Sequence, residues 1–227
     1  MGETYSCRSD SVVSCWWFKL VSGNSKGCFE RGIIISLRHE FPQFMARCVL
    51  ILLDFITQGQ VMLIIFSGLP GSGKSTIAQA LAKQLNALYL RIDTIEQAIL
   101  KAEEDDREMG PTGYFVAYSL ARENLQLGAT VIADSVNPLA LTRDAYRDIA
   151  LSVRTGFLEI EIVCSDKVEH RKRVETRVSE VEGLTLPDWK DVTDLNYEPW
   201  NREHLILDSY SLSSDECVSR IIKVLSR

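Results

Sequence analysis

The fold is decided by the stretch Gly68-Leu69-Pro70-Gly71-Ser72-Gly73-Lys74-Ser75-Thr76, which fills every required position of the pattern G-x-x-x-x-G-K-[ST]. The apolar run 62–66 precedes it, and residues 76–85 after it have the apolar spacing of a helix. Strand, glycine-rich loop and helix therefore follow one another in the order that a phosphate-binding loop requires. The alternative is a glycine-rich turn that binds nothing, and the flanking strand and helix argue against it.

The residue types in this loop suit ATP and Mg²⁺. Glycines let backbone N–H groups turn inward around a polyphosphate, and the N-terminus of the following helix adds the positive end of its dipole. Lys74 reaches the β- and γ-phosphates, and Ser75 places its hydroxyl on Mg²⁺, while Thr76 is a helix-side hydroxyl. The predicted nucleotide contacts are therefore all nine residues of the loop: Gly68, Leu69, Pro70, Gly71, Ser72, Gly73, Lys74, Ser75 and Thr76.

Length and composition describe an ordinary globular chain. Its 227 residues suffice for one domain with a full core and an appendage. The net charge of −6 argues against a surface that binds nucleic acid in general. The six cysteines include no C-x-x-C pair, so neither a zinc ribbon nor a redox motif is predicted. We expect free thiols and a cytoplasmic location, as suits an ATP-dependent enzyme.

Residues 1–60 differ from the rest of the chain. They hold four of the cysteines and show no sustained periodicity, and their longest apolar run is interrupted at Asp54, too early for a membrane span. The first core strand begins at Met62. We therefore divide the chain into an N-terminal extension, 1–60, and a core domain, 61–227. The extension is either a poorly packed appendage or the product of a start codon assigned too far upstream.

Two further segments, 87–93 and 130–134, have the pattern of a strand that ends in a carboxylate, Asp93 and Asp134 respectively. Ligands gather at the carboxyl ends of strands in open α/β sheets, so both positions suit chemistry. Asp134 can complement Ser75 at Mg²⁺, either directly or through water. The alternative for each aspartate is a cap on the helix that follows.

Five strand candidates alternate with helices, which predicts one parallel sheet covered on both faces. The remaining two strand candidates are 157–164 and 204–208, and Ser213 to Glu216 has the pattern of a capping box that opens the last helix. Arg143 and Arg147 lie four residues apart on one helix face, where a solvated position is more usual than substrate contact. Trp189 and Trp200 are interpreted as packing residues.

A basic segment lies between the fourth and fifth strand candidates. It contains Arg171, Arg173 and Arg177, and arginines on a mobile segment can close over a nucleotide and neutralise the transferring phosphoryl group. Arg173 and Arg177 are four residues apart, so both can face one ligand. We predict a catalytic role for these two and a nucleotide contact for Arg171. A solvated basic helix is the alternative.

From Met62 onward the chain resembles the P-loop kinase-like ATPases related to gluconate kinase, adenylylsulfate kinase and chloramphenicol phosphotransferase. Beyond the phosphate loop, the likeness rests on the segments 91–95, 131–138 and 197–200, which look like an uncharacterised branch of that group. The resemblance implies an α/β, three-layer P-loop NTPase fold with a five-stranded parallel sheet in the order 2-3-1-4-5. It also implies a small lid over about 171–196 and makes Asp93 the base that activates an acceptor hydroxyl.

One position departs from that group. Several relatives carry an arginine three residues after the aspartate to hold an anionic substrate, and this chain has Glu96 there. A phosphate- or sulfate-bearing acceptor is therefore less expected.

The leading interpretation is an enzyme that moves the γ-phosphoryl of ATP to a hydroxyl of a small molecule, with Lys74, Asp93, Arg173 and Arg177 as its catalytic residues. A second is a regulatory module that binds or slowly hydrolyses ATP without an acceptor. A polynucleotide 5′-kinase is disfavoured by the acidic net charge. A GTPase is disfavoured because no N-K-x-D element is present.

Overall fold

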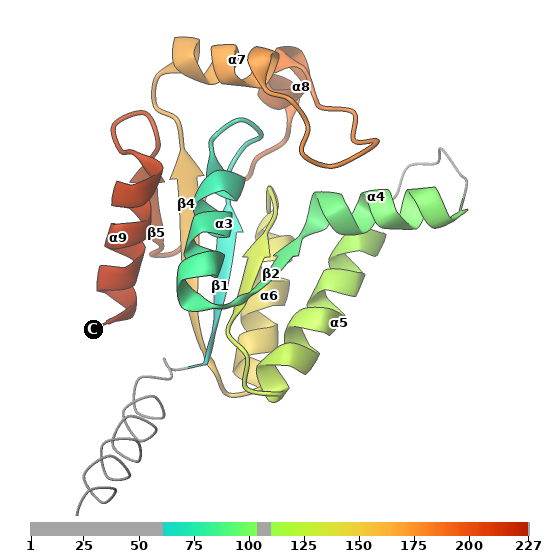
Figure 1. Cartoon of the computed structure of the whole chain (residues 1–227), viewed down its shortest axis with the longest axis vertical. Coiled ribbons are helices and arrows are strands. Elements are labelled where there is room, and N and C mark those ends of the chain that lie inside the picture. The colour runs from blue at the N-terminus through green and yellow to red at the C-terminus, as the bar shows by residue number, and fades with distance from the viewer. Residues whose placement is uncertain (1–60, 104–109, 227) are drawn as a thin grey trace, which may run out of the picture. The chain divides into compact units, whose positions relative to one another are not determined.

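The structure, a computed structural model, describes residues 61–103 and 110–226, so the predicted extension 1–60 lies outside the described residues. Five parallel strands form one sheet in the order β2-β3-β1-β4-β5 (Figure 1), which confirms the predicted fold class and strand order. The strands are β1 (Met62–Ser67), β2 (Leu88–Arg91), β3 (Val131–Asp134), β4 (Gly156–Val163) and β5 (Leu205–Asp208).

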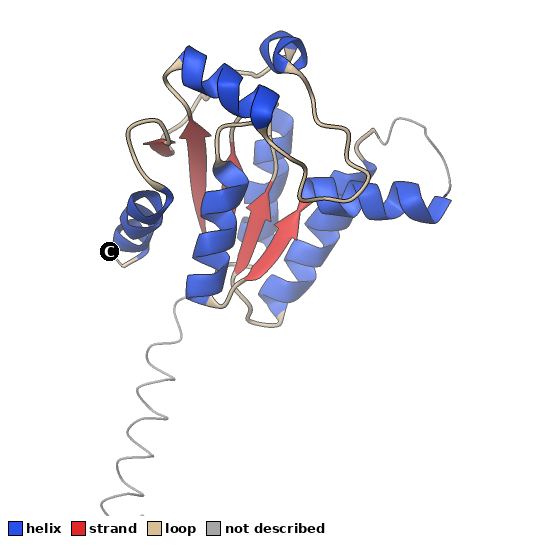
Figure 2. Cartoon of the chain, turned by 45° about the horizontal axis from the view of Figure 1, so that its top comes forward, coloured by secondary structure: helices blue, strands red, loops and turns tan. Residues whose placement is uncertain are grey.

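Helices cover both faces of the sheet (Figures 1 and 2). Their bounds are α3 (Lys74–Leu85), α4 (Ile92–Glu103), α5 (Thr112–Gln126), α6 (Ala140–Ser152), α7 (Lys167–Thr176), α8 (Trp189–Asp194) and α9 (Ser214–Leu225). None of the helices in the described ranges is both long and apolar enough to cross a membrane.

Strand β1 builds the core on both of its faces because successive side chains point to opposite sides. Ile64 and Phe66 pack with α3 and α9, whereas Leu63 and Ile65 pack with α5 and α6. All four side chains are fully buried, as the near-continuous apolar run of a central parallel strand requires. The phosphate loop that follows β1 is therefore anchored at the centre of the sheet.

Helices α7 and α8 lie above the carboxyl ends of the strands, and the segment 177–188 connects them (Figure 1). Strand β2 forms one edge of the sheet. It ends at Arg91 and α4 begins at Ile92, so the predicted strand 87–93 is too long. Asp93 consequently lies in the first turn of α4 instead of at a strand end. The chain turns into the helix early because Ile92, 4% exposed, packs inward at that point.

The C-terminal end of the domain follows its prediction. Ser213 and Glu216 form the predicted capping box of α9, in which the Ser213 hydroxyl accepts from the Glu216 amide at 3.3 Å. The Glu216 carboxylate accepts from the Ser213 amide at 2.8 Å, so two amides at the helix start are satisfied.

Arg143 corrects one prediction. Its side chain is buried, not solvated, with 1% exposure. It donates to the Glu198 carbonyl at 2.9 Å, and its guanidinium carbon lies 4.5 Å from the centre of the Trp200 ring. The segment after α8 is thereby held against α6, and Trp200 has the packing role that we predicted.

A second anchor fixes the same region. Arg202 donates to the Glu159 carboxylate at 2.6 and 2.8 Å and also contacts Asp144. The Glu159 side chain is 3% exposed, so its charge depends on this guanidinium.

Candidate functional site

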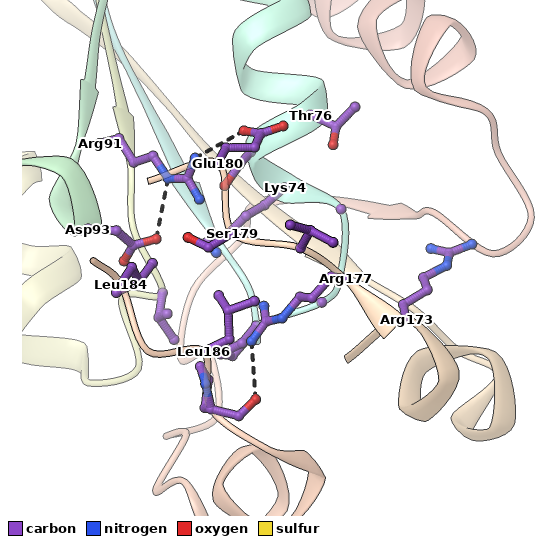
Figure 3. Close-up of a pocket in the computed structure, with 17 residues that line it drawn as sticks. Lys74, Thr76, Arg91, Asp93, Arg173, Arg177, Ser179, Glu180, Leu184 and Leu186 are labelled. Carbon is purple, nitrogen blue, oxygen red and sulfur yellow. Dashed lines mark hydrogen bonds and ion pairs between the residues drawn. The ribbon is translucent and has the colours of Figure 1, made fainter. Parts of the chain in front are cut away.

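A cavity of about 350 Å³ lies between the phosphate loop, the first turn of α4 and the segment after α7 (Figure 3). It brings together residues that are as much as 117 positions apart in sequence, from Pro70 to Pro187, because the carboxyl ends of parallel strands meet at one edge. The predicted site residues that line it are Pro70, Gly71, Gly73, Lys74, Ser75, Thr76, Asp93, Arg173 and Arg177.

The conformation of the loop requires its glycines. Gly71 and Gly73 have φ of 81° and 88°, in the left-handed region that favours glycine. Gly68 has φ of 139°, and a Cβ there would lie 2.3 Å from the Ile162 carbonyl oxygen. Gly73 precedes Lys74, the first residue of α3, so the N-terminal amides of this helix open toward the cavity.

Lys74 is buried, with 8% of its surface exposed, and lines the cavity as the first residue of α3. Thr76 is exposed at the cavity rim, in keeping with a helix-side hydroxyl. The other three loop residues, Gly68, Leu69 and Ser72, line a second pocket that also involves α8 instead of this cavity.

Asp134 at the end of β3 has one carboxylate oxygen in use and one without a partner. Its Oδ2 accepts from the Tyr89 hydroxyl at 2.5 Å, and burial followed by the charge of Asp134 raises the pKa of Tyr89, which therefore stays protonated as a donor. Oδ1 is buried and meets no hydrogen-bond partner within the described parts of the chain. Ser75 lines the cavity, whereas Asp134 is not among the lining residues. A carboxylate oxygen without a partner is a ligand of the hard oxygen type that Mg²⁺ prefers.

Asp93 faces the cavity from α4 and is paired with Arg91 (Figure 3). Arg91 Nε donates to Asp93 Oδ2 at 3.3 Å, and Arg91 Nη1 donates to Glu180 Oε2 at 3.2 Å. Glu180 belongs to the segment after α7 and also accepts from Gln79 at 3.1 Å. These contacts tie the segment after α7 to Arg91 and α3, and among the described residues the other Asp93 oxygen has no hydrogen-bond partner.

The three arginines of the predicted lid divide into two groups. Arg173 and Arg177 both line the cavity, with Arg173 on the far side from Asp93 and Arg177 between them (Figure 3). Arg173 donates to the Ser209 hydroxyl at 3.0 Å and Arg177 to the Pro187 carbonyl at 3.3 Å. Arg171 instead pairs with Glu175 at 2.7 Å on the exposed face of α7 and is not part of the cavity lining.

Sequence reasoning missed two charged residues of the cavity lining, Arg91 and Glu180. Arg91 could have been found in the sequence because it lies two residues before the predicted site residue Asp93. Glu180 could not, because its partners Arg91 and Gln79 lie 89 and 101 residues away.

Comparisons with known proteins agree with this fold. The probable adenylyl-sulfate kinase of Pseudomonas aeruginosa is 28% identical over 167 residues, which cover 70% of this chain and 74% of that protein. The APS kinase CysC of Mycobacterium tuberculosis, solved with AMPPNP and APS, has a TM-score of 0.57 at 19% identity and covers 74% of this chain and 99% of that one. A gluconokinase of Sinorhizobium meliloti has a TM-score of 0.51 at 19% identity, covering 72% and 91%.

The two solved structures support the fold alone because their identity to this chain is low. A family model described as an AAA domain (AAA_33) matches residues 63–194, which begin in β1 and run through the phosphate loop to the end of α8. The match covers the phosphate loop and the first four strands, so the chain belongs to the AAA_33 family, and its sequence is similar to those of adenylyl-sulfate kinases.

Proposed function

We propose that this chain is a kinase that transfers the γ-phosphoryl group of ATP to a hydroxyl of a small molecule. The observation that carries the proposal is that Lys74 and Asp93 both line one cavity. A cation that follows the phosphoryl group thus shares this cavity with a carboxylate that can accept the proton of an attacking hydroxyl. The likeness to adenylyl-sulfate kinases supports the reaction class and leaves the acceptor open.

In the proposed mechanism, the amides at the start of α3 and Lys74 hold the phosphates of ATP. Ser75 and Asp134 would hold Mg²⁺, which supplies charge neutralisation at the phosphate oxygens when it is bound. Arg173 and Arg177 neutralise charge from the lid side and exclude water. Asp93 orients the acceptor hydroxyl and takes its proton.

The Arg91–Asp93 ion pair favours a second candidate, an ATP-binding module without an acceptor, because it gives the Asp93 carboxylate a structural partner within the protein. The two candidates make different predictions for radiolabelled ATP. A kinase transfers the label from the γ-position to an organic product, whereas a module that hydrolyses ATP releases it only as inorganic phosphate. A panel of sugars, nucleosides, amino alcohols and sugar acids as acceptors, with Lys74→Ala as the inactive control, tests the proposal.

A further inference from the structure

A buried histidine joins the phosphate loop to α7. His170 is 6% exposed, and its Nε2 lies 2.9 Å from the carbonyl oxygen of Pro70, which precedes it by 100 residues. A carbonyl oxygen only accepts hydrogen bonds, so Nε2 carries a hydrogen and donates it. The first helix of the predicted lid therefore contacts the loop through a directed hydrogen bond.

Two further contacts fix the imidazole ring of His170. The indole of Trp189, the first residue of α8, meets the ring edge to face, with 5.3 Å between the ring centres and 84° between the planes. Aromatic rings prefer arrangements of this kind. The His170 amide donates to the Asp166 carbonyl at 2.9 Å, which fixes the backbone that carries the ring. The ring cannot turn away from Pro70 without losing its contact with Trp189.

The hydrogen bond from His170 also sets the direction of an amide in the loop. The Pro70 carbonyl and the Gly71 N–H belong to one peptide unit, and the described ranges contain no cis peptide bond. In a trans peptide these two groups point in opposite directions. Because the Pro70 carbonyl is turned toward α7, the Gly71 N–H is turned away from α7. Gly71 itself lines the cavity, together with Gly73 and Lys74.

The Gly71 amide is available to a ligand, whereas two neighbouring amides are not. The Gly68 amide donates to the Val136 carbonyl at 3.1 Å, and the Ser72 amide donates to the Leu69 carbonyl at 3.2 Å. Within 61–103 and 110–226 the Gly71 amide donates to no other group of the protein. An amide of this kind in a loop before a helix N-terminus is a donor suited to a phosphate oxygen.

The residues on either side of this peptide do little to hold it in place. Its rotation changes the ψ of Pro70 and the φ of Gly71. The proline ring restricts only the φ of Pro70, and glycine adopts positive and negative φ about equally well. Gly71 has φ of 81° in this structure. A rotated peptide would turn the Pro70 oxygen, in place of the Gly71 N–H, toward an anionic phosphate.

We propose that His170 is a positioning residue for the nucleotide. Its Nε2–H holds the Pro70–Gly71 peptide in the orientation that directs the Gly71 N–H to a phosphate of ATP. The proposal deepens the kinase function given above and rests on its ATP site. His170 touches neither ATP nor the acceptor and acts only through the peptide that it holds.

The test measures the affinity of the full chain for ATP and for tripolyphosphate, each with Mg²⁺, by calorimetry. Tripolyphosphate has no base or sugar and therefore reports on the phosphate contacts alone. His170→Phe keeps an aromatic ring beside Trp189 and removes the donor. The Kd should rise at least about tenfold for both ligands, the scale of one hydrogen bond to a charged group. His170→Asn, whose shorter amide does not reach the Pro70 carbonyl, should repeat the loss without an added apolar ring.

His170→Gln is the conservative variant, because its longer amide places a donor near the position of Nε2 and should restore most of the affinity. The matched control is His204→Phe. His204 is also a buried histidine, stacked on Trp200 with 4.0 Å between the ring centres, and it lies outside the cavity lining. His204→Phe should leave the affinity for both ligands unchanged. Thermal unfolding of every variant ensures that binding is compared between folded proteins.

Three outcomes would overturn the positioning role. They are unchanged affinity in His170→Phe and His170→Asn, an equal loss in His170→Gln, and a loss for ATP that tripolyphosphate does not share. An equal loss in His170→Gln would assign the effect to ring packing and not to the donor. Failure of the wild type to bind ATP would instead overturn the proposed function itself.

Discussion

Replacing Asp93 by asparagine tests the chemistry of the site most directly. The change keeps the shape and the hydrogen-bonding capacity of the side chain and removes its basicity. General-base assistance contributes about 10²- to 10⁴-fold to a rate. At about 1.36 kcal/mol for each factor of ten, phosphoryl transfer should therefore lose about 2.7 to 5.4 kcal/mol of transition-state stabilisation.

The structure also limits how much Asp93→Asn can destabilise the fold. The Asp93 side chain is 34% exposed, and its pair with Arg91 spans 3.3 Å, so the loss of this ion pair costs at most about 1 kcal/mol. Arg91 keeps its contact with Glu180. For a domain of this size the midpoint of thermal unfolding should fall by no more than about 2 to 4 °C.

The measurements are kcat for label transfer, ATP affinity by calorimetry and thermal unfolding of the same preparation. Asp215→Asn is the matched control because Asp215 also lies in the first turn of a helix, α9, and is exposed and absent from the cavity lining. Transfer at the wild-type rate in Asp93→Asn would refute the base assignment and leave Asp93 as part of an ion pair only. A parallel loss of ATP affinity would show that its role is structural or linked to magnesium.

Further changes probe the loop, the core and the extension. Lys74→Ala should abolish ATP turnover, since it removes the charge that follows the γ-phosphoryl group, and persistent turnover would exclude the loop from the mechanism. Gly71→Ala should weaken ATP binding at least tenfold in calorimetry, because its φ of 81° and a Cβ 2.5 Å from an α7 methyl group strain the loop; unchanged affinity would contradict this. Arg202→Ala should destabilise the fold by about 3 to 5 kcal/mol in denaturant unfolding, because the buried Glu159 loses its partner, and a loss below about 1 kcal/mol would argue against a buried charge there. Deletion of 1–60 should leave a cooperatively folding protein that binds ATP, and loss of cooperative unfolding would place the extension in the core.

Much of this architecture could be predicted because it depends on local pattern. The loop motif, the apolar run of β1 and the capping box at Ser213 each involve neighbouring residues, and all three are where the sequence indicated. The strand order came from resemblance to a known fold, not from periodicity. The apolar Ile92 extends the predicted strand to Asp93, because periodicity does not distinguish an inward-facing first residue of a helix from the last residue of a strand.

The remaining features depend on contacts between distant segments. Arg143 and Arg147 have the spacing of an exposed helix face, yet the Glu198 carbonyl, 55 residues away, and the Trp200 ring bury Arg143. In the sequence Glu180 is likewise one of several acidic residues in a polar segment. Only its contact with Arg91 in the folded chain distinguishes it from the others. No window of sequence contains both partners of either contact, so only the folded chain identifies them.

The contact between α7 and the phosphate loop has a consequence for the energetics of nucleotide capture. His170, 6% exposed, donates from Nε2 to the Pro70 carbonyl at 2.9 Å, and Gly68 donates to the Val136 carbonyl at 3.1 Å. These two hydrogen bonds hold the loop from two sides. The conformational entropy of the loop is therefore lost when the protein folds, and not when ATP binds. ATP should then associate with the loop as fast as with a preformed surface, and the later ordering should be confined to the segment 177–188, which would appear as a separate, slower phase in a stopped-flow trace.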